Sequence, residues 1–316
     1  MFDMVGIGNP VYDTIITPFS RTDGRMLSGC STNACLAAKR LGLPKIGLVG
    51  SIGPDYSQKF QSDMKKYGIE ANVDTSSTET GGFHLIYDTK GDRTLDVLGI
   101  AGKVNARNLS EEFLQSRYFI VGPIMGEVDL ELIRFLRSST SGKIFLDPQG
   151  LIRLLGPDKR VIHRCDQEQF SQIVELVDFV KPNETESETI TGQKDPIVAL
   201  HRLQEMGAQV PIVTLAERGS LLLDGGTIHK IPAYSTKAID PTGAGDTYAG
   251  SFITEYSRTR RLADSALFAS AAASVKVEQI GPDFQMTPST VENRRDSLRG
   301  LVTSTSSKKN GAQPTG

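Results

Sequence analysis

Cysteine and histidine are scarce in this chain, and their scarcity excludes several kinds of site. The 316 residues include three cysteines, Cys30, Cys35 and Cys165, an odd number without a C-x-x-C pair. Neither a disulfide framework nor a zinc site is therefore indicated. The four histidines are scattered and show no H-E-x-x-H spacing, so we expect none of them to be a metal ligand.

An excess of charge of one sign and long apolar runs are also missing. Lys and Arg together number 35 against 37 Asp and Glu, a net charge of −2 that gives no basic surface for nucleic acid. No apolar run approaches the roughly 18 residues that span a bilayer. The first residues, MFDMVGIG, lack the basic and then apolar pattern of a signal peptide. We therefore expect a cytoplasmic protein with neither a nucleic-acid nor a membrane partner.

Two common phosphate-binding patterns are absent as well. Gly6 and Gly8 lack the third glycine of the dinucleotide fingerprint, and Pro10 stands where that motif's helix would be under way. An NAD-dependent oxidoreductase is therefore a weak hypothesis. No G-x-x-x-x-G-K-[ST] segment occurs, which excludes the P-loop kinases.

The most informative segment that is present is IDPTGAGDTYAGSF, residues 239–252. Gly243 and Gly245 allow the backbone to approach a ligand closely, and a helix is predicted from Ala244 onward. The unpaired N–H groups of Gly243, Ala244 and Gly245 would point outward from that helix start, where the helix dipole favours an anion. We expect this anion cradle, residues 243–245, to hold a phosphate.

Asp246 lies in the first turn of the predicted helix, beside the expected phosphate. A carboxylate repels a phosphate, so we interpret Asp246 as the base that accepts a proton from a hydroxyl attacking the γ-phosphate. The alternative is an ordinary loop that enters a helix, with Asp246 as a favourable first-turn charge.

Residues 240–246 resemble the C-terminal signature of the ribokinase/PfkB family of carbohydrate and nucleoside kinases. Other segments follow in the family's order: residues 9–13, residues 29–34, residues 181–186 with an N-x-x-E pattern, and residues 213–219. The resemblance implies an enzyme that uses ATP and Mg²⁺. Whether a monovalent cation also takes part stays open.

The resemblance also implies a role for each matching residue. The anion cradle stabilises the transferred group and Asp246 is the base. Substrate binding is assigned to Asn9, Asp13, Gly29, Asn33, Asp147, Gln149 and Arg153. Nucleotide binding is assigned to Asn183, Thr214, Gly219 and Gly281. Glu186 would hold Mg²⁺ through water, because a carboxylate does not bind a phosphate directly.

Structural alternatives accompany several of these roles. Asp13 is otherwise a turn aspartate, Asn33 a helix cap and Arg153 a solvated arginine at a helix start. Glu186 is otherwise part of an acidic helix N-terminus. Cys30 stands where the family usually has a second glycine, so we expect it to reshape the floor of the acceptor pocket.

Short apolar runs alternate with amphipathic stretches, which predicts an α/β fold with a doubly wound, mostly parallel sheet flanked by helices. Strands are predicted at residues 4–7, 46–49, 118–121, 144–146, 179–180 and 211–215. Helices are predicted at residues 33–41, 57–67, 129–136, 166–177, 197–206, 244–256 and 262–277.

Residues 1–299 are predicted to form a single domain. A β-hairpin is predicted at residues 83–87 and 94–98, and residues 12–18 could add a strand to it. In the resembled family such a small sheet, here about residues 12–30 and 82–99, is a lid over the substrate and often a homodimer interface. Residues 300–316 are polar and small, so we expect a disordered tail.

The sequence therefore predicts a phosphotransferase that moves the γ-phosphate of ATP to a hydroxyl of a small polyol-like molecule, a sugar or a nucleoside. A phosphorylated acceptor would need a cationic cluster, for which Arg21, Arg25, Arg93 and Lys103 are candidates. The alternatives are a cyclitol or sugar-phosphate kinase, or a non-catalytic metabolite-sensing protein of the same fold.

Overall fold

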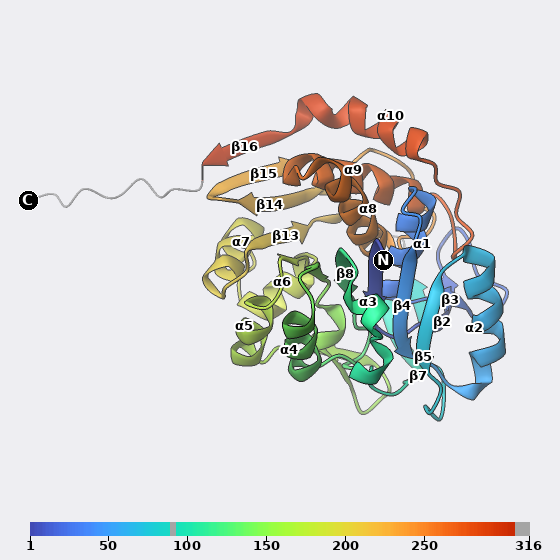
Figure 1. Ribbon diagram of the computed structural model, residues 1–316. Coiled ribbons are helices and arrows are strands. Elements are labelled where there is room, and N and C mark those ends of the chain that lie inside the picture. The colour runs from blue at the N-terminus through green and yellow to red at the C-terminus, as the bar shows by residue number, and fades with distance from the viewer. Residues whose placement is uncertain (89–92, 307–316) are drawn as a thin grey trace, which may run out of the picture.

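A twisted ten-stranded sheet forms the centre of the computed structural model, which describes residues 1–88 and 93–306 (Figure 1). The strand order is β16-β15-β14-β13-β12-β9-β8-β1-β4-β5. Pairing is parallel from β5 to β13 and antiparallel from β13 to β16. The strands are β1 (Met4–Ile7), β4 (Ile46–Ser51), β5 (Glu70–Asp74), β8 (Tyr118–Val121), β9 (Lys143–Leu146), β12 (Phe179–Val180), β13 (Val210–Thr214), β14 (Ser220–Asp224), β15 (Thr227–Ile231) and β16 (Thr303–Ser306).

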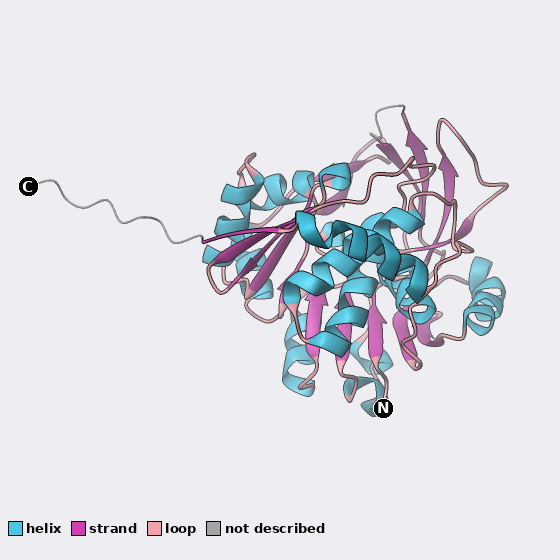
Figure 2. Cartoon of the chain, turned by 90° about the horizontal axis from the view of Figure 1, so that it is seen from above, coloured by secondary structure: helices cyan, strands magenta, loops and turns pink. Residues whose placement is uncertain are grey.

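Helices cover both faces of this sheet (Figure 2). Consecutive strand residues point to opposite faces, so Leu48 packs in one hydrophobic core and Val49 in the other. The first core is covered by α1 (Cys30–Arg40), α2 (Pro54–Tyr67), α8 (Ala244–Thr259), α9 (Leu262–Lys276) and α10 (Pro288–Leu298). The second is covered by α3 (Glu111–Leu114), α4 (Leu130–Ser139), α5 (Gln167–Val174), α6 (Glu184–Thr191) and α7 (Pro196–Glu205). The predicted doubly wound α/β fold is confirmed.

A second, four-stranded sheet with the order β3-β2-β6-β7 lies beside the carboxyl ends of the parallel strands. It consists of β2 (Val11–Ile16), β3 (Met26–Ser28), β6 (Gly82–Tyr87) and β7 (Arg93–Gly99), and we call it the lid. A hairpin of β10 (Arg153–Leu155) and β11 (Val161–His163) extends it, with Val97 N donating to Lys159 O at 3.0 Å. The predicted hairpin strands and the strand near Tyr12 are present, whereas the hairpin turn, residues 89–92, lies outside the described residues.

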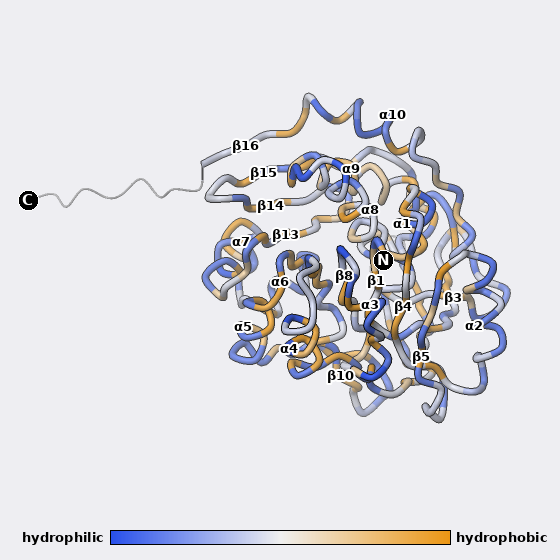
Figure 3. Tube along the Cα trace, viewed as in Figure 1, coloured by the Kyte–Doolittle hydropathy of each residue, from blue (hydrophilic) through white to orange (hydrophobic). Residues whose placement is uncertain are grey.

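The C-terminal segment differs from the prediction. Residues 303–306 form β16, which pairs antiparallel with β15, so the expectation of disorder from residue 300 was wrong up to residue 306. The outer edge of β15 offers unpaired backbone groups, and a polar segment can pair with them because the ladder needs only backbone atoms. The preceding helix α10 is largely hydrophilic (Figure 3). Residues 307–316 lie outside the described residues.

Within the described part of the chain, no helix is both long enough and apolar enough to cross a membrane.

Candidate active site

The predicted anion cradle lies at the start of α8. Gly243 is the residue before the helix and has φ 77°, in the left-handed region that glycine adopts without strain. Neither Gly243 nor Gly245 donates its N–H to a protein acceptor among the described residues. The Ala244 N–H, however, donates to Pro241 O at 3.2 Å, so the expectation that all three N–H groups point outward was wrong for Ala244.

Asp246 is held by two amide side chains from distant parts of the chain. Asn33 Nδ2 donates to Asp246 Oδ2 at 2.8 Å, and Gln149 Nε2 approaches Asp246 Oδ1 at 3.3 Å. Asn33 comes from α1, which packs very closely against α8. A Cβ on Gly250 of α8 would lie 2.1 Å from Ala34 O, so only glycine permits this approach. The close helix packing therefore joins two predicted site residues that are 213 positions apart.

A buried cation that the prediction did not include as a site residue lies beneath the cradle. Lys181 Nζ pairs with Asp147 Oδ2 at 2.8 Å, and the two side chains are 3% and 2% exposed. A Cβ on Gly245 would lie 3.2 Å from the same Nζ, which places the ammonium next to the cradle. Burial favours the neutral amine, but Asp147 and Glu186 outweigh it and raise the pKa of Lys181. Its position directly after a predicted strand was the signal that could have identified it.

Cys30 lies with Asp147 and Asp246 in one cluster, in which the thiol sulfur and one oxygen of each carboxylate are within 4.8 Å of one another. Its side chain is buried, and a Cβ on Gly122 would be 2.6 Å from its Sγ. Burial, together with Asp147 and Asp246, raises the pKa of the thiol well above its ordinary value. Cys30 is therefore a neutral group packed against Gly122 beside the carboxylates.

Asp13 lies inside β2 and not in a turn, which removes the alternative role proposed for it. Its Oδ1 accepts from Phe83 N of the lid at 2.8 Å, and the residue is 3% exposed. Burial raises its pKa to about 6, although Ser28 and the Phe83 N–H favour the carboxylate. Asp13 thus connects β2 to β6 within the lid.

Asn9 and Gly29 hold the neighbouring backbone in place. Asn9 Nδ2 donates to Gly102 O at 2.8 Å and its Oδ1 accepts from Ser51 N at 2.7 Å. The Asn9 amide therefore connects the end of β4 to the segment that follows β7. Gly29 has φ 114°, and a Cβ there would lie 2.8 Å from Asn9 O, so a glycine is required before α1.

Two arginines reach the site from the lid and from β10. Arg153 is buried at 5% exposure, its Nη1 donates to Ile124 O at 3.4 Å, and its Nε has no protein partner. Arg153 begins a strand, so the alternative of a solvated arginine at a helix start was wrong. Burial and the nearby Arg93 lower its pKa. Arg93 Nη1 donates to Tyr87 Oη at 3.3 Å, and Tyr87 Oη hydrogen bonds to Thr242 Oγ1 at 3.0 Å, beside the cradle.

The residues predicted to bind the nucleotide lie mainly at the ends of β12 and β13. Asn183 and Glu186 form a capping box at the start of α6: Asn183 Oδ1 accepts from Glu186 N at 2.8 Å, and Glu186 Oε2 accepts from Asn183 N at 2.9 Å. Thr214 forms a parallel bridge to Asn183. The geometry thus gives Asn183 and Glu186 a structural role and brings Thr214 next to them.

Gly219 and Gly281 are required by their surroundings. A Cβ on Gly219, which has φ 90°, would lie 1.9 Å from Ile231 O. Gly281 has φ 72° and packs against Met26 of the lid, where a Cβ would be 2.9 Å from Cε. Close backbone packing and a positive φ explain Gly219, whereas the positive φ alone explains Gly281, because the Met26 side chain can move.

The sequence profile of the pfkB family carbohydrate kinases matches residues 24–289. The chain belongs to this family. A cytidine kinase from Thermococcus kodakarensis is 31% identical over 269 residues, which cover 83% of this chain and 91% of that protein. A ribokinase from Lactococcus lactis is 25% identical over 285 residues, 88% of each protein.

Solved structures agree on the fold of this pfkB family member. A pyrophosphate-dependent kinase in the ribokinase family, complexed with a pyrophosphate analog and myo-inositol, has a TM-score of 0.77 at 22% identity and covers 92% of this chain and 99% of its own. The chain is therefore a kinase of the ribokinase type, for sugars or nucleosides. The oxidoreductase and the non-catalytic sensor are set aside.

Proposed function

We propose that this kinase transfers the γ-phosphate of ATP to a hydroxyl of a nucleoside or a sugar, with Asp246 as the base. The observation that carries the proposal is the Asp246 carboxylate, oriented by Asn33 and Gln149 at the helix start that forms the cradle. A carboxylate oriented in this way can accept the proton of the acceptor hydroxyl, and the unpaired N–H groups next to it can bind the phosphate.

The chemistry follows from these positions. The acceptor hydroxyl gives its proton to Asp246 while its oxygen forms a bond to the γ-phosphorus. The bond from that phosphorus to the bridging oxygen breaks, and ADP leaves. The N–H groups of Gly243 and Gly245 and the Lys181 ammonium stabilise the negative charge on the transferred group. Asn33 and Gln149 keep the carboxylate aimed at the acceptor.

The carboxylates at this edge of the sheet fit Mg²⁺ better than the neighbouring thiol does. Magnesium prefers oxygen ligands and retains several waters, so Glu186 and the neighbouring Asp147 would hold it largely through water, and Cys30, which lies beside Asp147, would not be a ligand. When bound, the ion would neutralise charge on the ATP phosphates.

We propose a nucleoside as the first acceptor to test, because the relative at 31% identity is a cytidine kinase. Asp13 supports this acceptor class, since a buried carboxylate can accept hydrogen bonds from two vicinal hydroxyls of a ribose or another polyol. A cyclitol is the second candidate, because a similar fold is found in a kinase complexed with myo-inositol.

The decisive experiment measures ADP release with Mg-ATP and cytidine, adenosine, ribose, fructose, fructose 6-phosphate or myo-inositol. Asp246→Asn should lower kcat by roughly a thousandfold or more, because the amide cannot take the proton, while the Kd for ATP stays within about threefold. Asp224→Asn, on the exposed end of β14, is the matched control. Normal turnover of Asp246→Asn would contradict the assignment of the base.

We also propose that the chain forms a homodimer through the lid. Ile16 of β2 and Ile86 of β6 are register partners, and they are 38% and 39% exposed. Leu98 of β7 is 42% exposed on the same sheet. Large apolar side chains that gather on one exposed sheet favour an interface.

A further inference from the structure

A second buried lysine, outside the groups used above, lies behind the cradle. Lys276 is the last residue of α9 and is 3% exposed. Its Nζ donates to Gln279 O at 3.0 Å and is 3.7 Å from Asp240 Oδ2. Asp240 is fully buried, so water does not solvate its carboxylate. The Lys276 ammonium is the cation next to it.

Asp240 fastens the segment that leads into the cradle. Its Oδ1 accepts from Thr242 N at 2.9 Å, and its Oδ2 accepts from Gly281 N at 3.4 Å. The Asp240 N–H donates to Val277 O at 3.0 Å, just after Lys276. Asp240 therefore connects the segment that precedes the cradle to the end of α9 and to Gly281.

The ammonium lies directly behind the cradle. A Cβ on Gly243 would be 3.7 Å from Lys276 Cε. Burial lowers the pKa of Lys276, whereas Asp240 and Asp246 act in the opposite direction, and Arg40 adds a like charge. The Phe284 ring, with its centroid 5.6 Å from Nζ, closes one side of the site.

We infer that Lys276 is a built-in cation that pairs with Asp240 and holds the cradle in its phosphate-binding conformation, so that this kinase needs no added monovalent cation there. The inference rests on the proposed function of the cradle. Lys276 acts through Asp240 and is therefore a positioning residue. Without the ammonium, the buried carboxylate loses its counter-charge, and its bonds to Thr242 and Gly281 weaken.

The test compares Lys276→Met with the wild-type chain in a buffer whose only monovalent cation is tetramethylammonium, which is too large for the site. Wild-type turnover should be the same in this buffer and in potassium or ammonium chloride. Lys276→Met should lose roughly a hundredfold in kcat, the scale of removing one stabilising group. Ammonium or methylammonium should restore at least a tenth of wild-type kcat, because either ion can occupy the vacated space. Lys194→Met, at an exposed position, is the control and should behave as the wild type.

Two further results make the outcome decisive. If Lys276→Met does not fold, the double variant Asp240→Asn with Lys276→Met removes both charges and should fold but remain slow. ATP affinity, measured by calorimetry without any acceptor, should fall in Lys276→Met and recover with ammonium. Turnover and ATP affinity of Lys276→Met near wild-type levels, or a wild type that requires potassium, would overturn the inference. A wild type that binds ATP but phosphorylates no acceptor would instead contradict the proposed function.

Discussion

At the scale of single residues, burial decides which charges this site can use. Asp13 is 3% exposed and carries a raised pKa, whereas Lys181 stays charged because Asp147 lies 2.8 Å away. Cys30 is buried beside two carboxylates and remains a neutral thiol. The same three residue types on a protein surface would show their ordinary titration.

The acceptor kcat/KM should depend on the protonation of Asp13. Its folded-state pKa is about 6, so the carboxylate that we propose as the acceptor of two hydroxyl hydrogen bonds is present above pH 6 and lost below it. We expect kcat/KM to fall about tenfold per pH unit below that point. The pH profile of acceptor kcat/KM checks this, and Asp13→Asn should be slow and lack the inflection.

The stability of the protein gives an independent control on Asp13. Burial raises the pKa of Asp13 above the unfolded value of 3.8. The contribution of Asp13 to the free energy of unfolding is therefore fully present below pH 3.8 and is lost as the pH rises through about 6. Asp13→Asn should therefore raise Tm at pH 8 relative to the wild type, or leave it unchanged. Because the asparagine oxygen can still accept from Phe83 N, a large loss of Tm at pH 8 would contradict the prediction.

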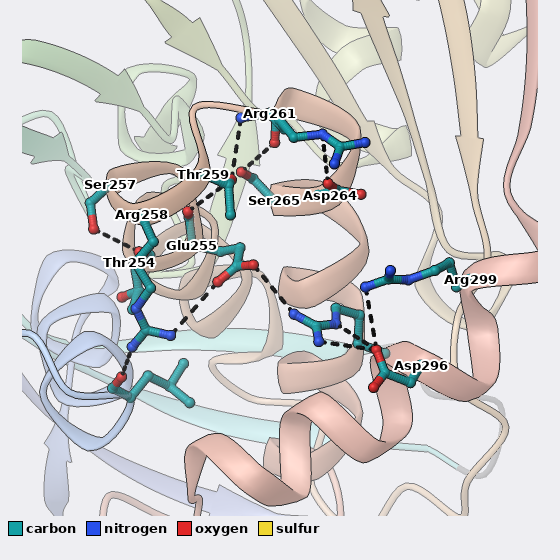
Figure 4. A network of polar contacts seen from close by, with 12 residues as sticks. Thr254, Glu255, Ser257, Arg258, Thr259, Arg261, Asp264, Ser265, Asp296 and Arg299 are labelled. Carbon is teal, nitrogen blue, oxygen red and sulfur yellow. Dashed lines mark hydrogen bonds and ion pairs between the residues drawn. The ribbon is translucent and has the colours of Figure 1, made fainter.

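At the scale of elements, the site depends on how closely α1 and α8 approach. Gly250 faces Ala34 with no space for a Cβ, and one turn earlier Asp246 meets Asn33. A second set of contacts holds the other end of α8. Arg258, and Arg295 of α10, approach the Glu255 carboxylate at 3.7 and 3.3 Å. Figure 4 shows Glu255 next to Arg258 in this network.

Gly250→Ala should separate the two helices. The added Cβ would lie 2.1 Å from Ala34 O, so α1 must move and Asn33 would withdraw from Asp246. We expect a loss of roughly 2 kcal/mol in the free energy of unfolding and a larger fractional loss in kcat than in ATP affinity. Urea denaturation and steady-state kinetics measure both. Gly300→Ala is the matched control, because a Cβ there meets no atom within 4 Å.

Glu255→Ala should destabilise the packing of α8 against α10. The Glu255 side chain is 7% exposed and that of Arg295 is 16% exposed, so removal of the carboxylate leaves a largely buried guanidinium without this partner. Allowing for the greater exposure of Arg258, we expect a loss of about 2 kcal/mol. Thermal or urea unfolding checks this. Asp264→Ala removes the pair between a partly buried carboxylate and the exposed Arg261 and should cost less than about 0.5 kcal/mol.

At the scale of the whole molecule, the lid sheet has one face on the site and another in solvent. Val11, Ile15, Phe83 and Leu85 pack inward, whereas Ile16 and Ile86 are exposed. The alternation of side chains along the strands produces this division. A dimer formed through this exposed apolar sheet, which belongs to the lid over the proposed acceptor site, would couple dimer formation to acceptor binding.

Replacing Ile86 with glutamate should dissociate the proposed dimer. A charge at that position cannot be buried against a second copy without a partner. We expect the wild type to have twice the chain mass of 34.3 kDa in light scattering, and Ile86→Glu to have the monomer mass. Val198→Glu, at an exposed apolar residue of α7, is the control. A monomeric wild type would rule out the lid interface under those conditions.

The sequence by itself determined the fold class, the helix start at Ala244 and the candidate base, because these follow from local patterns: apolar periodicity, glycine before a helix, and an acid in its first turn. It did not include α6 among the predicted helices, because the polar sequence of α6 lacks an amphipathic stripe, and it gave a helix N-terminus only as the alternative role of Glu186. The Asn183 and Glu186 capping box shows that this helix start is present. The sequence-based prediction also missed β16, because pairing with β15 is a backbone interaction with a distant strand.

Only the tertiary structure decided which side chains meet. Asn33 joins Asp246 across 213 residues because Gly250 lets two helices touch, and Lys276 joins Asp240 because α9 ends behind the cradle. The burial that raises the pKa of Asp13 and the Asp147 contact that keeps Lys181 charged likewise arise from packing. Local sequence patterns fix the elements, whereas contacts between distant segments fix the chemistry of the site.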